Sequence, residues 1–311
     1  MMAIQDSPQS VVHSPVRSHE PLAGYTSWRV GGPADRFFQA ADVQDLAVFL
    51  SQLPQEEPLF WLGLGSNLLV RDGGIRGTVI ATHGALTGLT LLEPHTVRAE
   101  AGVPCAKVAR FSARHDLCGV EFLAGIPGVI GGALAMNAGA WGGEIWPWIK
   151  AVETIDRQGV IRRRTPEHYA IAYRQVQGPL DEWFTAALLQ LNPGDGTASM
   201  ARIRELLEQR SRTQPTGVAS CGSVFRNPPG DHAARLIETA GLKGLQLGGA
   251  CVSTKHANFI VNTGKASAFD LERLITKVAE TVERIHGVRL TPEVRIVGEF
   301  AAAHEVRDDE I

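Results

Sequence analysis

The sequence lacks the patterns that mark most disulfide, zinc and membrane proteins. Its 311 residues include only four cysteines, widely spaced and without a C-x-x-C pair, so we expect free thiols in a reducing compartment. No run of about 20 apolar residues is free of glycine, so no membrane-spanning helix is expected. Residues 1–20 are polar and lack the apolar core of a signal peptide. Together these absences predict a cytoplasmic protein without a metal site.

An excess of positive charge is also lacking. The chain has 30 Lys and Arg against 33 Asp and Glu, and its formal net charge is −3. Proteins that bind nucleic acid or membrane surfaces usually carry a basic excess, so neither is expected as a partner. A small charged molecule held by local basic groups remains compatible with this balance.

Glycine, in contrast, is concentrated in two loops. Residues 121–140 contain five glycines, and a second loop at residues 63–70 reads GLGSNLLV. Glycines leave main-chain N–H groups open to a ligand, and Pro127 suits the first turn of a helix whose N-terminus would face that ligand. Neither loop fits a dinucleotide or Walker motif, since Leu68 stands where the former needs glycine. We predict a pyrophosphate cradle, and a glycine-rich helix packed tightly on a sheet stays open as the alternative.

The order of apolar runs and turn signals predicts an α+β chain. Strands are expected at residues 34–40, 59–64, 77–81, 86–92, 96–101, 151–156, 160–164, 184–191 and 293–297, and helices at 42–52, 104–117, 197–212, 231–240 and 267–286. Asp42 and Asp231 are expected helix caps. Ser267 with Asp270 forms a capping-box pattern at the start of the last helix, and Gly287 follows its expected end. A short helix from Thr165 is expected to end before Tyr173. The strands do not alternate regularly with helices, so a βαβ repeat is not expected.

Five motifs occur in order along the chain. They are GLGSNLLV (63–70), GIPGVIGGALAMNAGA (125–140), CGSVFRN (221–227), STKHANFIVN (253–262) and PEVRIVGE (292–299). Together they resemble the MurB family, the UDP-N-acetylenolpyruvoylglucosamine reductases of peptidoglycan synthesis, from about Tyr25 to Glu299. The resemblance implies non-covalent FAD in a two-part domain of the vanillyl-alcohol-oxidase (PCMH) type. It also implies a C-terminal α+β substrate-binding domain.

The resemblance and the loop signal at residues 192–196 predict four parts of the chain. These are a disordered lead-in (1–20), an FAD-binding domain of two subdomains (21–194), a substrate-binding domain (195–303) and a tail (304–311). The FAD contacts that the resemblance implies are Gly63, Gly65, Ser66, Asn67, Leu68, Gly125, Ile126, Pro127, Gly128, Gly131, Gly132, Asn137, Ala138 and Gly139.

Three residues gain a catalytic role only through the resemblance. Alone, Ser223 is typical of a turn, and Arg174 and Glu293 of surface charges or a structural ion pair. The resemblance implies that NADPH reduces the flavin and that hydride then passes from N5 to C3 of the enolpyruvyl group of UDP-N-acetylglucosamine-enolpyruvate. Ser223 would protonate C2, giving UDP-N-acetylmuramate. The resemblance also implies that Arg174 and Glu293 lie together across the domain boundary, where they would stabilise the enolate-like intermediate. The expected substrate contacts are Tyr173, Asn227, Lys255, His256 and Arg295.

One difference within the family concerns a tyrosine. Some members carry, between the arginine and the serine, an inserted segment whose tyrosine closes over the substrate. The interval from Arg174 to Ser223 contains no tyrosine, so the chain resembles the shorter, second type. A monomer is expected as a separate prediction. Two other functions stay open: an FAD-dependent oxidase or dehydrogenase acting on another substrate, and a catalytically silent nucleotide-sugar sensor.

Overall fold

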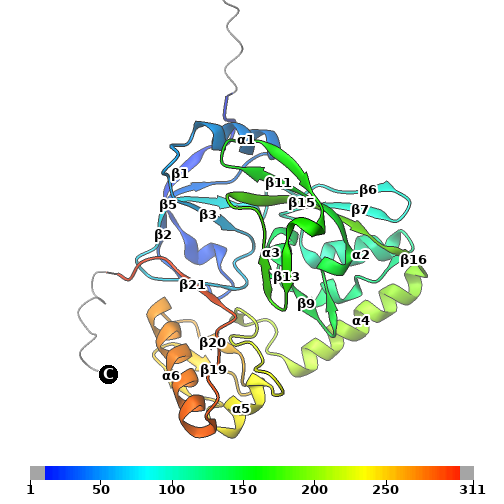
Figure 1. Cartoon of the computed structure of the whole chain (residues 1–311). Helices are drawn as coiled ribbons and strands as arrows, with labels where there is room; N and C mark the ends of the chain where they lie inside the picture. The colour runs from blue at the N-terminus through cyan, green and yellow to red at the C-terminus, as the bar shows by residue number, and fades with distance from the viewer. Residues whose placement is uncertain (1–10, 302–311) are drawn as a thin grey trace, which may run out of the picture.

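The computed structural model describes residues 11–301, which form three lobes, each built around its own sheet (Figure 1). In Figure 1 the first lobe is blue to cyan, the second mainly green, and the third yellow to red. Each lobe has its own cluster of buried apolar side chains, the first lobe having two. The predicted α+β class is confirmed. Within residues 11–301, no helix has the length and apolar character needed to cross a bilayer.

The first lobe is a four-stranded sheet covered by one helix. Its strand order is β1-β2-β5-β3, with bounds Val16–Pro21, Pro33–Phe38, Ile75–Ala81 and Leu59–Leu62. Helix α1 (Val43–Gln52) begins as predicted at Asp42, whose carboxylate accepts hydrogen bonds from two main-chain N–H groups of the first turn. The rings of Phe38 and Phe49 stack with centroids 3.7 Å apart, so the helix is held on the sheet by buried aromatic contact.

The expected disordered lead-in of residues 1–20 is wrong for residues 16–20. These residues form most of β1, which pairs antiparallel with β2 from Val16 opposite Phe38 to Pro21 opposite Pro33. The segment is too polar to show a buried strand by its pattern, and it is ordered by main-chain pairing instead. Residues 1–10 lie outside the described residues, as does the predicted tail, residues 304–311.

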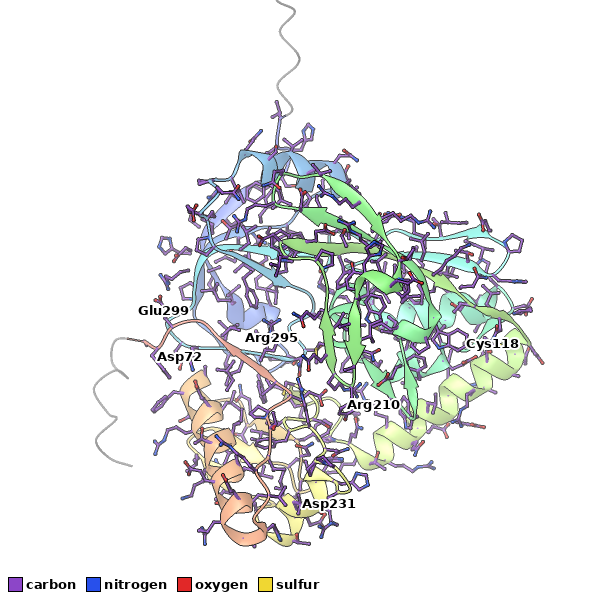
Figure 2. The ribbon with its side chains drawn as sticks, viewed as in Figure 1. Asp72, Cys118, Arg210, Asp231, Arg295 and Glu299 are labelled. Atoms are coloured by element: carbon purple, nitrogen blue, oxygen red, sulfur yellow. The ribbon has the colours of Figure 1, made fainter. Side chains whose placement is uncertain are left out.

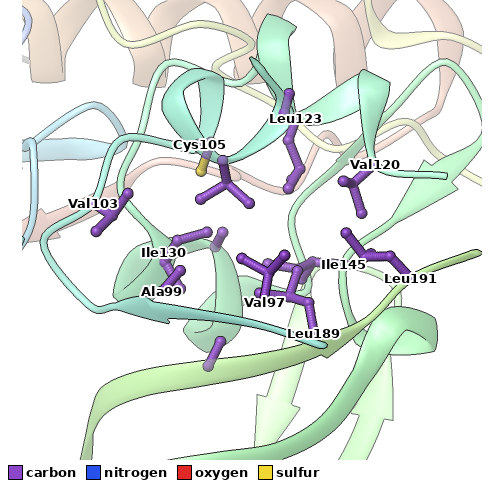
Figure 3. Close-up of a cluster of buried hydrophobic side chains, with 14 of the residues drawn as sticks. Val97, Ala99, Val103, Cys105, Val120, Leu123, Ile130, Ile145, Leu189 and Leu191 are labelled. Atoms are coloured by element: carbon purple, nitrogen blue, oxygen red, sulfur yellow. The ribbon is translucent and has the colours of Figure 1, made fainter. Parts of the chain in front are cut away.

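The second lobe is a five-stranded antiparallel sheet with helices on one face. The strand order is β12-β11-β15-β7-β6, with bounds Ile161–Arg164, Ile149–Asp156, Glu182–Gln190, Thr96–Glu100 and Leu89–Glu93. Helices α2 (Cys105–Arg114) and α3 (Ile130–Met136) supply side chains to its core. Figure 3 shows that core, in which Val97 and Leu189 of the sheet lie close to Ile130 of α3.

Helix α4 (Gly196–Thr213) belongs to this second lobe by its packing. The prediction assigns residues 197–212 to the substrate-binding domain, but Ile203 is 1% exposed within the core of the second lobe. The helix lies against α2 and against the 3₁₀ segment Glu121–Gly125. The apolar stripe of a helix predicts that one face is buried, but not which lobe covers that face.

The third lobe is a small four-stranded sheet packed against two helices. The strand order is β17-β20-β19-β18, with bounds Ala219–Ser220, Ile260–Asn262, Ala250–Val252 and Gln246–Leu247, and the helices are α5 (Ala233–Thr239) and α6 (Ala268–His286). The predicted capping box of Ser267 and Asp270 is confirmed at the start of α6. Gly287 ends the helix in the left-handed conformation, as predicted.

The predicted cap at the start of α5 is wrong. Asp231 does not cap the helix; its carboxylate instead forms an ion pair with Arg235. The first helical N–H, that of Ala233, donates to the side-chain oxygen of Asn227 at 3.1 Å. A residue six positions upstream therefore supplies the cap, which a local pattern does not reveal.

The end of the chain returns to the first lobe. Strand β21 (Arg295–Val297) pairs in parallel with β4 (Leu68–Val70), so the second glycine loop and the last motif lie side by side. Arg71, which follows β4, forms a bidentate ion pair with Glu272 of α6, so the first and third lobes are also joined by charge. The remaining short elements are β8 (Leu117–Cys118), β9 (Gly139–Ala140), β10 (Gly143–Glu144), β13 (Ala170–Ala172), β14 (Gln175–Gln177), β16 (Asn192–Pro193), and the 3₁₀ segments Leu22–Tyr25, Trp146–Trp148 and Pro166–His168.

Candidate active site

A cavity of about 800 Å³ is lined by residues of all three lobes. Both glycine loops contribute to its wall, and the third lobe contributes Ser223 and the residues around it. Of the predicted FAD contacts, every residue except Asn137 lines this cavity. Asn137 is 1% exposed, and its side chain donates to Glu144 and to the carbonyl of Ala172, so it supports the wall from behind.

The glycines of the cradle divide into two kinds. A Cβ atom at Gly128 would meet nothing closer than Ser66 Oγ at 3.5 Å, and one at Gly132 would meet nothing within 4 Å. A Cβ atom at Gly131 would instead lie 3.0 Å from Ala101 Cβ, and one at Gly125 would overlap the Trp141 ring. Gly128 and Gly132 therefore leave space on the cavity side. The tight-packing alternative applies to Gly125 and Gly131.

The predicted helical turn at Pro127 is wrong. Helix α3 begins at Ile130, and its N-cap is Val129. The N–H groups of Ile130 and Gly131 donate to the carbonyl oxygens of Val103 and Ala101, at 2.9 and 2.8 Å. These two N–H groups are therefore used inside the protein and are not open to a ligand.

Arg174 and Glu293 meet across the lobes, as expected. Arg174 Nε donates to Glu293 Oε1 at 3.0 Å, and the two Nη atoms donate to the carbonyl oxygens of Asn137 (3.3 Å) and Gly139 (2.7 Å). Arg174 lies at the tip of the β13–β14 hairpin, not just after the predicted helix at residue 165, and its φ is +55°. The ion pair is largely shielded, with 17% and 14% of the two side chains exposed.

Glu293 titrates in an unusual environment. Burial raises the pKa of the Glu293 carboxyl group, and the positive charges of Arg174 and Arg226 oppose that rise without cancelling it. The negative charge of Glu293 in turn adds to the burial that raises the pKa of the Cys221 thiol. The site therefore holds two arginines beside one buried carboxyl group and one neutral thiol.

Ser223 is held in the same cavity by its neighbours. The main-chain N–H of Val224 donates to the carbonyl of Asn258, and the carbonyl of Val224 accepts from the N–H of Glu293 at 2.7 Å. Gly222 before it takes a φ of +82°, which favours glycine. Within residues 11–301 the Ser223 hydroxyl group makes no hydrogen bond, so its proton is available to a ligand.

The predicted substrate contacts fall into two groups. Tyr173, Asn227 and Arg295 line the cavity, although Asn227 also caps α5. Lys255 and His256 are outside its lining. Lys255 Nζ donates to the carbonyl of Ser211 instead, and burial lowers the pKa of the His256 side chain. The part of the STKHANFIVN motif that lines the cavity is Asn258 and Phe259. The side-chain amide of Asn258 bonds both main-chain groups of Phe225.

Other cavity residues were not assigned from the sequence. Arg210, near the end of α4, lines the cavity, and its Nε donates to Gln214 at 3.2 Å. Burial lowers the pKa of Arg210, and no carboxylate pairs with it in the described part of the chain. Figure 2 shows Arg210 and Arg295 near the junction of the lobes. The rings of Trp61 and Trp183 stack 5.2 Å apart in the cavity wall, and they meet only because β3 and β15 belong to adjoining lobes.

Comparison with known proteins gives consistent matches over most of the chain. Residues 214–297 match the family model of the UDP-N-acetylenolpyruvoylglucosamine reductase C-terminal domain, and residues 34–165 match that of an FAD binding domain. The UDP-N-acetylenolpyruvoylglucosamine reductase of Alkalilimnicola ehrlichii is 61% identical, covering 91% of this chain and 95% of its own. That of Methylococcus capsulatus is 62% identical over 91% and 93%.

A solved structure agrees with these sequence matches. The crystal structure of UDP-N-acetylenolpyruvylglucosamine reductase (MurB) from Thermus caldophilus superposes with a TM-score of 0.78 at 33% identity. The match covers 92% of this chain and all of that one. The predicted arrangement, an FAD-binding part followed by a second α+β part, is confirmed.

Proposed function

This chain belongs to the MurB family of UDP-N-acetylenolpyruvoylglucosamine reductases, and on that premise we propose that Arg174, Ser223 and Glu293 carry its proton and charge chemistry. It is an FAD-containing oxidoreductase that uses NADPH to reduce UDP-N-acetylglucosamine-enolpyruvate to UDP-N-acetylmuramate, in peptidoglycan precursor synthesis. The observation that carries the proposed roles is that these three side chains, from two lobes, line one cavity together with both glycine loops.

The cavity fits FAD on two structural grounds. Gly128 and Gly132 leave open space where a side chain would otherwise stand, so a pyrophosphate can approach the main chain. The volume of about 800 Å³ lies in the range of cofactor and ligand sites. When bound there, FAD would supply the hydride-transfer chemistry that links NADPH to C3 of the enolpyruvyl group.

Arg174 is prepared to bind the enolpyruvyl carboxylate. A guanidinium group has five N–H donors, and three of those of Arg174 are used by Glu293 and two carbonyl oxygens. The remaining two face no protein acceptor among the described residues and can serve an anion. Hydride addition at C3 places negative charge at C2 and on the carboxylate, and a fixed guanidinium group stabilises that charge without reorganising.

Glu293 and Ser223 supply the rest of the charge chemistry. Because burial raises its pKa, Glu293 takes up a proton more readily than an exposed glutamate, and a second carboxylate from the substrate strengthens this tendency. A protonated Glu293 donates a hydrogen bond to the charge that develops on the substrate. Ser223, whose hydroxyl group is unbonded within residues 11–301, donates the proton that completes C2.

The proposal extends to where and how the enzyme works. All four cysteines are free, which supports a reducing compartment such as the cytoplasm. We also propose a monomer as the active unit, because the described residues of a single chain bring Arg174, Ser223 and Glu293 to one cavity.

A turnover assay tests the function directly. NADPH oxidation by the purified FAD-bound protein is expected only when UDP-N-acetylglucosamine-enolpyruvate is added, with UDP-N-acetylmuramate formed in equal amount. Rapid NADPH oxidation that follows dissolved oxygen and ignores the enolpyruvyl substrate would indicate the oxidase alternative. A protein that binds the nucleotide sugar but never oxidises NADPH would be the silent sensor.

The open glycine of the cradle gives a second test. In Gly128→Val, a branched side chain enters the space that the pyrophosphate needs, so the protein is expected to purify nearly colourless. The ratio of flavin absorbance to protein absorbance measures the loss. Gly24→Val is the matched control, because a Cβ atom at Gly24 meets nothing within 4 Å, so the side chain is accommodated there too, and Gly24 is outside the cavity lining. A yellow Gly128→Val protein with full FAD content would place the pyrophosphate elsewhere.

A further inference from the structure

Arg226 joins the third lobe to the β13–β14 hairpin of the second. It lies three residues after Ser223, and its Nη2 donates to the main-chain carbonyl oxygen of Arg174 at 3.3 Å. The N–H of Arg226 donates to the carbonyl of Thr291 at 2.9 Å, which fixes it beside the chain leading to Glu293. Its Nε is buried and has no partner among the described residues. Arg226 does not line the cavity, so it reaches a ligand only through other residues.

The hairpin tip is held by the hydrogen bonds of the Arg174 side chain and by the Asn137 side chain, which donates to the carbonyl of Ala172, and Arg226 adds a bond to the main chain of Arg174 itself. Its strands β13 and β14 are three residues long, and every residue of β13 is exposed. Arg174, at the tip, takes the left-handed φ of +55°, which residues with a Cβ atom adopt at a cost. A hydrogen bond to the carbonyl of Arg174 therefore acts on the peptide whose orientation aims the guanidinium group.

The charge of Arg226 also acts on the ion pair of Arg174 and Glu293. The groups that face Glu293 are Arg174, Arg226 and the neutral thiol of Cys221. Arg226 lowers the pKa of Glu293 through its positive charge, after the larger effects of burial and of Arg174. One side chain thus touches the main chain of one member of the ion pair and electrostatically influences the other.

We propose that Arg226 is a positioning residue for the reduction: it fixes the Arg174 peptide at the hairpin tip, so that the Arg174 guanidinium group is held against Glu293 and the substrate carboxylate. This inference rests on the proposed role of Arg174. It assigns the arginine of the CGSVFRN motif a task across the lobe boundary, whereas Ser223 of the same motif faces the cavity directly.

A double-mutant cycle tests whether Arg226 acts through Arg174. Arg226→Met is expected to lower the kcat of enolpyruvyl reduction about tenfold, as loss of one positioned hydrogen bond predicts. In the Arg174→Met background the same change is expected to have no further effect, because the residue it positions is gone. Arg226→Lys keeps the charge but not the planar fork, so its kcat is expected to lie between those of the wild type and Arg226→Met. Arg235→Met, in an exposed ion pair of the same lobe, is the matched control.

The pH dependence of kcat for enolpyruvyl reduction separates positioning from a general loss of structure. The limb that Glu293 controls is identified as the one missing in Glu293→Gln. That limb is expected to move to higher pH in Arg226→Met, because a positive charge that lowers the pKa of Glu293 is removed, and to stay in place in Arg226→Lys and Arg235→Met.

Two results would overturn the inference. They are additive losses in Arg226→Met/Arg174→Met, and an unmoved limb in Arg226→Met. If Arg226→Met does not fold, the cycle with Arg226→Lys decides on the same criterion of additivity. Normal turnover in Arg174→Met alone would instead refute the proposed function of Arg174, so the two failures are distinguishable.

Discussion

Ser223→Ala is expected to leave flavin reduction by NADPH close to the wild-type rate and to slow reduction of the enolpyruvyl substrate by roughly 10²- to 10⁴-fold. That range is the usual contribution of a positioned acid, about 3 to 5 kcal/mol of the barrier. The two steps make different demands because only the second places a proton on C2. Anaerobic stopped-flow measurement of flavin absorbance, first with NADPH and then with the enolpyruvyl substrate, separates them.

The structure supports using alanine as a clean change at this position. The Ser223 hydroxyl group makes no hydrogen bond within residues 11–301, so its removal leaves no protein group without a partner. The main chain on its C-terminal side is held independently, by Asn258 and by the N–H of Glu293. Ser220→Ala is the matched control, since Ser220 lies three residues earlier in β17 and outside the cavity lining.

Two outcomes would change the role of Ser223. If both half-reactions slowed equally, the serine would shape the pocket and not donate the proton. If neither slowed, the proton would come from elsewhere, and Glu293 is the next candidate because burial raises its pKa. A variant that combines Ser223→Ala with Glu293→Gln would then distinguish Glu293 from water.

Features determined by neighbouring residues were predictable from the sequence. The capping box at Ser267 and the left-handed Gly287 set both ends of α6, and Asp42 sets the start of α1. These signals involve residues within four positions of each other, so no knowledge of the rest of the fold is needed. The glycine loops also predict an open main chain, although only the structure shows that Gly128 leaves open space whereas Gly131 packs closely against Ala101.

Features determined by distant pairing were not predictable. Strand β1 is polar and exists because β2 pairs with it, and α4 shows an apolar stripe without indicating which lobe covers it. Asn258 carries no catalytic signal, yet it bonds the main chain on either side of Phe225. The meeting of Arg174 with Glu293, 119 positions apart, was expected only through the family resemblance.

The second large effect is expected at Arg174. Arg174→Met removes the guanidinium group that the proposal places on the substrate carboxylate, and should lower kcat for enolpyruvyl reduction about 10²- to 10³-fold. Loss of one fixed electrostatic donor in an active site costs this much, about 2.7 to 4 kcal/mol. Single-turnover rates of flavin reoxidation measure the loss. Arg76→Met, which removes a more exposed arginine paired with Asp35, is the control.

The change at Arg174 also affects Glu293, and this allows a sharper comparison. Without Arg174 the buried carboxyl group loses its main favourable charge, so its pKa rises further and it binds a proton more readily. Arg174→Lys keeps a positive charge but cannot reach Glu293 and the carbonyl oxygens of Asn137 and Gly139 together, because a lysine ammonium lacks the planar fork. It should therefore recover only part of the rate.

The pair can be tested as a unit. If Arg174 and Glu293 stabilise the same developing charge, Arg174→Met with Glu293→Gln should be less damaged than the product of the two single losses. The reason is that the first change already alters the charge state on which the second depends. Independent, multiplicative losses would mean that the two residues act on different parts of the substrate. A near-normal rate in Arg174→Met would remove the guanidinium group from the mechanism and leave the ion pair as a tie between the lobes.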